Sequence, residues 1–465
     1  MNANLRPSDL PSPALLRGGV RALDRSDIPR VATLFLAKFR GRPQARSARL
    51  EQHLAHFFLD HPHYDEATAS LIHEEPDGRI SGFLGIAPVH MRFDGASCTG
   101  SIISTWMVED AERDSRAAVA LARTHLARGH GLTMADTTSR MSIGFHAFMR
   151  VSFAATHSLR WIKPLNFAAS GLVSAANAVG MPAPVAAIAA AKACELAARR
   201  LARRDGFSIC EGWRIDPISV DRFAEGLGAL TERLRLAPVW SAADLRWLLD
   251  FAAAGEETLD LVLCEARDRA GELAGVCAYR IDQRGRADIL QIALRPRAEE
   301  AVLRLVMNLA REGGAISLGG RTDPAVSRGL FSIARVLYLH GPGVVVKTAD
   351  PDAFRAISAG EGLIGGLVGD AWTPLATDRY ARRDVLGGNC ALGRAGGKAG
   401  ENRIERGSDQ LGRGHDEGGH AHGEKPVFGR RGARTASHET ADCCPHCQSF
   451  AATHGSRPLG RSGRE

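Results

Sequence analysis

One stretch of this chain combines residue types and spacing that could bind an anionic ligand, STWMVEDAERDSRAAVALARTHL (104–126). It reads as an apolar strand, a short charged loop and a helix that opens on small residues. The backbone N–H groups at the start of such a helix, reinforced by the helix dipole, can bind a phosphate. The loop, however, has no glycine and carries four acidic residues, Glu109, Asp110, Glu112 and Asp114. It is therefore either a phosphate-binding loop or an ordinary helix start whose acidic residues complement the dipole.

The elements that must position this stretch alternate between strands and helices. Residues 20–39 read VRALDRSDIPRVATLFLAKF, which predicts a short strand followed by a capped helix. Residues 69–95 predict strands that are separated by turns at Pro-Asp-Gly and Asp-Gly. The pattern is typical of an α/β domain with a hairpin before the 104–126 stretch.

The same order of elements occurs twice. Residues 259–285 match 69–95 in length, pattern and turn placement, and residues 287–331 match 100–145. The period is far too long for a solenoid, so the repeat indicates two copies of one α/β domain. We place these domains at 20–163 and 207–384.

Three segments lie outside the two predicted domains. Residues 1–19 are polar and proline-punctuated, lack the apolar centre of a secretory signal, and predict a disordered leader. Residues 164–206 form an alanine-rich connector, for which we expect short helices packed on the domains; a helix of 165–204 lying on an anionic membrane surface is the alternative. Residues 385–465 are rich in glycine, arginine and histidine and predict a disordered tail. The cysteines and histidines of this tail are crowded rather than set in two spaced pairs, so no metal site is predicted.

Composition limits the possible partners. The 465 residues are 45% hydrophobic and 24% charged, which is typical of a folded soluble protein. The net charge of +7 comes largely from the tail and the connector, and no patch interleaves basic with aromatic residues, so no nucleic acid is expected. Nine cysteines are few for this length, and those before the tail are scattered through apolar or mixed segments, which favours reduced thiols and a cytoplasmic location.

The first predicted domain resembles the GNAT-type acyl-CoA N-acyltransferases. VRALDRSDIPRVATLFLAKF resembles the first strand and helix of that family, GRISGFLGIAPVHM its central hairpin, and STWMVEDAERDSRAAVALARTHL its cofactor segment. SRMSIGFHAFMRV resembles the helix that follows. The resemblance extends over 20–163 and, more faintly, over 207–380. It implies two tandem domains of α/β (α+β) class, each with a mixed, mostly antiparallel sheet flanked by helices.

The resemblance also implies which residues act. The acyl-CoA would lie along the end of the cofactor strand and the start of the next helix, which in this sequence are Trp106, Met107, Val108, Arg113, Ser115, Arg116, Ala117 and Ala118. Arg116 stands where the family has a glycine, and its guanidinium could bind phosphate directly. His146 stands where the family has the acid that protonates the leaving thiolate; an ordinary core or surface histidine is the alternative. For the base that takes the proton from the amine, the candidates are Glu74, Glu75, Glu109 and Asp136, and Asp136 is preferred because it ends the strand beside the cofactor strand.

The favoured function is transfer of an acyl group from acetyl-CoA or another acyl-CoA to an amine acceptor, without a metal. The second copy has Glu299 and Glu300 where the phosphate would lie, so it is expected to supply part of the acceptor site or to pack against the first copy. An inactive scaffold of the same fold, with peripheral membrane contact through 165–204, is the first alternative. An aminoacyl-tRNA-dependent peptidyl transferase is the second, and it would require a stronger basic face.

Overall fold

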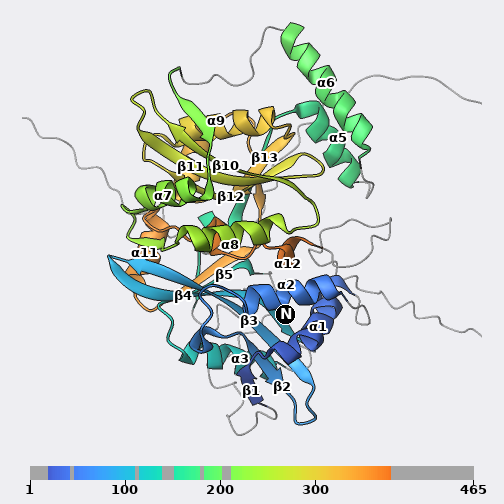
Figure 1. The fold of residues 1–465 in the computed structure, drawn as a ribbon, viewed down its shortest axis with the longest axis vertical. Coiled ribbons are helices and arrows are strands. Elements are labelled where there is room, and N and C mark those ends of the chain that lie inside the picture. Colours follow the sequence, from blue (N-terminus) through green and yellow to red (C-terminus); the bar gives the residue numbers. More distant parts are fainter. Residues whose placement is uncertain are drawn as a thin grey trace, which may run out of the picture. The chain divides into compact units, whose positions relative to one another are not determined.

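The computed structural model describes residues 19–41, 47–109, 115–138, 151–178, 183–201 and 211–378. The predicted leader, except for its last residue Gly19, therefore lies outside the described residues, as do the predicted tail, Arg113 and His146. None of the described helices is long and apolar enough to cross a membrane. Figure 1 shows two sheets with helices on their faces, and the predicted α/β class with two mixed, mostly antiparallel sheets is confirmed.

The first sheet has the order β1-β2-β3-β4-β5-β15-β6, with β9 paired to β3. Its only parallel pair among the described residues is β4 with β5. The β3–β4 hairpin turns at Asp94 and Gly95, whose φ values are 47° and 82°, as a tight hairpin turn requires. The strands are β1 (Gly19–Ala22), β2 (Leu71–Glu74), β3 (Ile80–Phe93), β4 (Ala96–Val108), β5 (Leu132–Thr138), β6 (Ser152–Phe153), β9 (Leu236–Pro238) and β15 (Gly343–Thr348).

The second sheet repeats this plan with the order β14-β7-β13-β12-β11-β10-β8. Here too one pair of the described strands is parallel, β12 with β13. The strands are β7 (Leu159–Pro164), β8 (Arg214–Pro217), β10 (Thr258–Arg267), β11 (Leu273–Asp282), β12 (Arg286–Leu294), β13 (Ser317–Arg321) and β14 (Leu337–His340).

The two halves of the chain exchange strands: the second half supplies β9 and β15 to the first sheet, and the first half supplies β7 to the second. β15, from the second half, lies in the first sheet between β5 and β6, where Val346 pairs with both Met134 and Ser152. β7, from the first half, lies in the second sheet between β13 and β14, where Trp161 pairs with both Gly320 and Tyr338. Each of the predicted domains 20–163 and 207–384 thus completes the sheet that the other begins.

The helices begin at local signals that the sequence carries. Ser47, Ser219 and Ser241 accept hydrogen bonds from the first-turn amides of α2, α7 and α8, and Asp323 does the same for α10. The connector contains α5 and α6. The helices are α1 (Ile28–Arg40), α2 (Ala48–Phe58), α3 (Arg116–Ala127), α5 (Phe167–Ala178), α6 (Val185–Leu201), α7 (Val220–Thr231), α8 (Ala242–Ala253), α9 (Glu299–Glu312), α10 (Pro324–Phe331), α11 (Pro351–Ala359) and α12 (Pro374–Thr377), with 3₁₀ turns at Arg25–Asp27, Glu66–Thr68, Thr156–Ser158 and Gly366–Val368.

One hydrophobic core joins the two halves. It contains residues of α1 and α2 together with residues of α7 and α8 and of the segment before α12. The rings of Phe57 on α2 and Phe251 on α8 stack with their centroids 5.4 Å apart, and Trp372 meets both edge-on. In Figure 1, α2 and α8 accordingly lie between the two sheets, whereas α3 lies on the other face of the first sheet. Burial of these large rings stabilises the contact between the halves.

Candidate functional site

The parallel strands β4 and β5 open into a gap. They pair only from Gly100–Leu132 to Ile102–Met134, although β4 runs on to Val108 and β5 to Thr138. β4 bends at this point, because Thr105 is an extra residue in its pairing with β3 and has a φ of 59°. Backbone groups along such an opening can hydrogen-bond an extended ligand in the manner of a strand.

The predicted cofactor residues lie at one end of this opening. Met107 and Val108 are buried at the end of β4, and Trp106 is half-buried. Ser115 and Arg116 are exposed at the start of α3, followed by buried Ala117 and half-buried Ala118. Ser115 makes no side-chain cap, so its hydroxyl does not occupy the first-turn amides of α3. The structure therefore brings the strand end and the helix start together, while their role in cofactor binding stays a prediction.

The first acidic residue of the loop is neutralised locally. The carboxylate of Glu109 forms an ion pair with Arg79, and its backbone carbonyl accepts a hydrogen bond from Lys38. Two of the other base candidates are held away from the opening, since Glu74 pairs with Arg21 at 2.7 Å and Glu75 lies 3.6 Å from His73 Nδ1. Asp136 is the candidate that the structure places at the opening.

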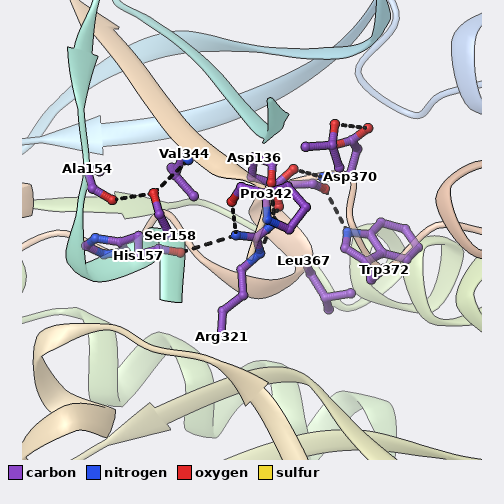
Figure 2. A network of polar contacts seen from close by, with 12 residues as sticks. Asp136, Ala154, His157, Ser158, Arg321, Pro342, Val344, Leu367, Asp370 and Trp372 are labelled. Atoms are coloured by element: carbon purple, nitrogen blue, oxygen red, sulfur yellow. Dashed lines mark hydrogen bonds and ion pairs between the residues drawn. The ribbon is translucent and has the colours of Figure 1, made fainter. Parts of the chain in front are cut away.

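Asp136 and Asp370 form a buried carboxyl pair between β4 and β5 (Figure 2). The amide of Asp370 donates to Asp136 Oδ1 at 3.0 Å. Ser104 on β4 donates to Asp370 Oδ2 at 2.6 Å, and Thr137 on β5 donates to Asp370 Oδ1 at 3.2 Å. Asp370 thus spans the opening from one strand to the other.

The two carboxyl groups hold their protons differently. Burial raises the pKa of Asp370 well above its usual value, and the neighbouring Asp136 raises it further. Burial also opposes ionisation of Asp136, but the hydrogen bond from Asp370 and the charge of Arg321 outweigh burial and lower the pKa of Asp136. The directions of the two shifts favour Asp370 as the site of the proton and Asp136 as the site of the negative charge in this coupled pair.

Arg321 reaches this pair from the second sheet (Figure 2). Its Nη2 donates to the carbonyl of Asp136, and its Nη1 donates to the carbonyls of His157 and Pro342, both at 3.2 Å. Its Nε lies 3.8 Å from Asp136 Oδ2 and has no hydrogen-bond partner among the described residues. Burial and the charge of Arg321 lower the pKa of His157 to about 4, so this histidine is neutral at pH 7.

A glycine-rich stretch, residues 363–372, carries Asp370 across the junction of the halves; we call it the crossing segment. Leu367 N donates to Gln291 Oε1 of β12 at 3.0 Å. Gly366 has a φ of 68°, and a Cβ there would lie 2.4 Å from the carbonyl oxygen of Leu290. A Cβ at Gly369 would lie 2.0 Å from Asp136 Oδ2. The crossing segment can approach both sheets only because these positions lack a side chain.

The second parallel pair opens in the same way and holds a larger cavity. β12 and β13 pair only from Arg286–Ser317 to Asp288–Gly319. The cavity beyond this point has a volume of about 70 Å³, and its lining residues include Asp136, Arg160, Arg280 and Arg321. The corresponding cavity beside β4 and α3 is smaller, about 10 Å³, and mainly apolar.

Sequence reasoning missed Ser104, Arg321 and Asp370. The only signal for Asp370 was the glycine-rich stretch around it, AGEGLIGGLVGDAW (359–372), which is typical of close backbone approach. The described residues contain no group of three or more histidine, cysteine or acidic side chains that could hold a metal ion.

No protein-family model and no curated protein sequence matches the chain. Among solved structures, a conserved protein of unknown function from Enterococcus faecalis V583, described as a probable N-acyltransferase, is 12% identical over 71% of this chain and 72% of its own, with a TM-score of 0.46. A GCN5-related N-acetyltransferase from Kribbella flavida is 13% identical over 71% of each chain, with a TM-score of 0.44. Saccharomyces cerevisiae N-myristoyltransferase with bound myristoyl-CoA is 13% identical over 73% of this chain and 81% of its own, with a TM-score of 0.43. These three structures are thus N-acyltransferases or a probable N-acyltransferase by name, but at these TM-scores the likeness places no residue and assigns no activity.

Proposed function

We propose that this protein transfers an acyl group from an acyl-CoA thioester to an amine. The observation that carries the proposal is the position of an ionised, buried carboxylate, Asp136, at the opening between β4 and β5. The start of α3 lies beyond the same opening, where its first-turn amides can meet a pyrophosphate. An extended thioester arm along β4 would then end near the carboxyl pair.

In this reaction the described residues position the reactants and accept a proton. The acceptor attacks the thioester carbonyl as the free amine, and Asp136 takes the proton that the nitrogen loses once the new C–N bond has made its N–H acidic. Asp370, which is protonated, keeps the negative charge on Asp136 through its hydrogen bond. Backbone N–H groups of β4 would stabilise the tetrahedral oxyanion, and holding both reactants together supplies most of the remaining rate enhancement. Protonation of the leaving thiolate by His146 stays a prediction.

One observation favours a second candidate, an inactive scaffold of the same fold. The crossing segment packs against Asp136 so closely that Gly369 has no room for a Cβ. If this contact is permanent, the acceptor side of the opening is closed and the protein binds without catalysing. Activity, rather than binding alone, separates the two candidates.

The test is calorimetric binding of acetyl-CoA and longer acyl-CoAs, followed by an acyl-transfer assay with a panel of amines. Arg116→Glu places a negative charge at the start of α3 and should weaken binding by about tenfold or more. The matched control is Arg297→Glu at the start of α9, where Glu299 already pairs with Arg328 at 3.1 Å; it should leave binding unchanged. No binding of any acyl-CoA at millimolar concentration would refute the proposal, and binding without transfer would favour the scaffold.

A further inference from the structure

The cavity between β12 and β13 is lined by three arginines, Arg160, Arg280 and Arg321, and by three aspartates. Of the carboxylates that line it, Asp288 is paired with Arg160 at 2.8 Å, and Asp323 caps α10 by accepting a hydrogen bond from Val326 N at 2.7 Å. Within the part of the chain that the structure describes, the guanidinium groups of Arg280 and Arg321 hydrogen-bond only to backbone carbonyls, and the carboxylate of Asp136 lies 3.8 Å from Arg321 Nε. Guanidinium groups without a carboxylate at hydrogen-bond distance are suited to bind an anionic group that enters the cavity.

Arg280 is the side chain whose charge is least compensated. Among the described residues it makes one hydrogen bond, from Nη1 to the carbonyl of Trp372 at 3.0 Å, and no carboxylate lies within 4.0 Å of its guanidinium. Burial lowers its pKa, although the more distant charges of Asp288, Asp378 and Asp282 act in the opposite direction, so the protein surroundings replace its hydration only in part. A planar guanidinium in this situation can bind a carboxylate through two parallel hydrogen bonds.

The cavity is also contiguous with the candidate base. Asp136, Arg280 and Arg321 line the same space. Its volume of about 70 Å³ is sufficient to admit a small charged group. A molecule with its anionic group here can present another group to Asp136.

We propose that this cavity binds the carboxylate of an acceptor that also carries the reacting amine, so that the acceptor is an amino acid or a molecule with an amino-acid-like end. Arg280 binds the carboxylate and Arg321 fixes its distance from Asp136. The inference rests on the proposed acyl transfer for the role of the amine, whereas the binding of the carboxylate can be measured without it.

The first experiment measures thermal stabilisation of the full chain, without acyl-CoA, by matched pairs of ligands. L-phenylalanine is compared with phenethylamine, L-lysine with cadaverine, and β-alanine with propylamine; O-phosphoethanolamine and ethanolamine test a phosphate in place of the carboxylate. We expect stabilisation by carboxylate members only. Arg280→Gln should weaken their binding by about tenfold or more, whereas Arg246→Gln, a change at a partly exposed arginine on α8, should leave it unchanged.

Further results decide between the possible occupants. Equal stabilisation by the decarboxylated amines, stabilisation by the phosphate compound alone, or unchanged binding in Arg280→Gln would each overturn the carboxylate site. If Arg280→Gln does not fold, Arg280→Lys, which keeps the charge but loses the two-pronged hydrogen bond, should weaken carboxylate binding with less disturbance. Loss of acyl-CoA binding in the Arg280 variants would assign the cavity to the cofactor instead. Absence of acyl-CoA binding in the unaltered protein would refute the proposed function alone.

Discussion

The backbone amide of Asp370 donates a hydrogen bond to the carboxylate of Asp136 at 3.0 Å, although 234 residues separate them in the chain. Asp136 belongs to the first sheet, and Asp370 follows all the strands of the second. The pair therefore exists only when the two halves are assembled. A proposed catalytic carboxylate that depends on the partner half explains why one copy of the fold would not suffice.

The opposite roles of the two carboxyl groups can be separated by substitution. Asp136→Asn removes the proposed base and should lower the rate of acyl transfer by about a hundredfold or more. Asp370→Asn preserves a neutral group that can still donate to Asp136 and should keep most of the activity. Steady-state kinetics on both variants checks this, and equal loss of activity in the two would contradict the assignment of the proton to Asp370.

The same pair predicts a pH dependence of stability. Because the folded-state pKa of Asp370 is raised, its contribution to stability is fully present below its unfolded pKa and is lost as the pH rises through the folded pKa. Asp370→Asn cannot ionise, so its free energy of unfolding should decline less than that of the unaltered protein as the pH rises above the unfolded aspartate pKa of about 3.9. Parallel curves from urea titrations would show that Asp370 does not hold a proton in this range.

Substitution of Gly369 tests how closely the crossing segment must approach the first sheet. Gly369→Ala places a Cβ 2.0 Å from Asp136 Oδ2, so a shift of the segment should cost about 1–3 kcal/mol of unfolding free energy. Gly365→Ala is the matched control, since a Cβ there meets nothing within 4 Å and the backbone φ is −94°. Urea unfolding of both variants measures the difference. Equal stability would mean that the segment is looser than its contact with Asp136 indicates.

The strand exchange predicts that neither half folds alone. A chain that ends at residue 201 lacks β15, so β5 is left with β4 as its one neighbour in the first sheet. A chain that begins at residue 211 lacks β7, so β13 is left with β12 as its one neighbour in the second sheet. Each fragment would expose a long unpaired strand edge and should aggregate or remain largely unfolded. Mixing or co-expressing the two fragments should restore the native circular dichroism spectrum. Folding of an isolated fragment to native stability would contradict the exchange.

The parts of the fold that sequence reasoning predicted depend on short-range signals. The Asp94-Gly95 turn, the stretch from β4 to α3 and the position of Asp136 beside β4 all follow from residues close together in the chain. The strand exchange left no such signal, because β7 pairs with β13 and β15 pairs with β5, which lie far away in the chain. Arg321 and Asp370 meet Asp136 only across 185 and 234 residues, so periodicity and turn chemistry could not reveal them.

Four buried histidines should make the folded protein less stable as the pH falls. Burial is the largest cause that lowers the pKa of His53 and His157 to about 4 and that of His61 and His125 to about 3. In the unfolded chain these side chains titrate near about 6.5, so between about pH 6.5 and pH 4 the unfolded chain binds more protons than the folded one. Stability is therefore complete above about pH 6.5 and falls as the pH drops, by up to about 1.4 kcal/mol per pH unit for each histidine.

His125 isolates one of these contributions. Its Nε2 lies 3.2 Å from the hydroxyl of Ser101, a contact that a glutamine side chain can replace. His125→Gln should therefore reduce the slope of unfolding free energy against pH by about one proton between about pH 6 and about pH 5, a range in which most carboxylates are still ionised. Arg123→Gln, at an exposed position of the same helix, should leave the slope unchanged. An unaltered slope in His125→Gln would mean that His125 is protonated in the folded protein. A protonated His125, buried between Ser101 and Thr133, would need a counter-charge that neither hydroxyl supplies.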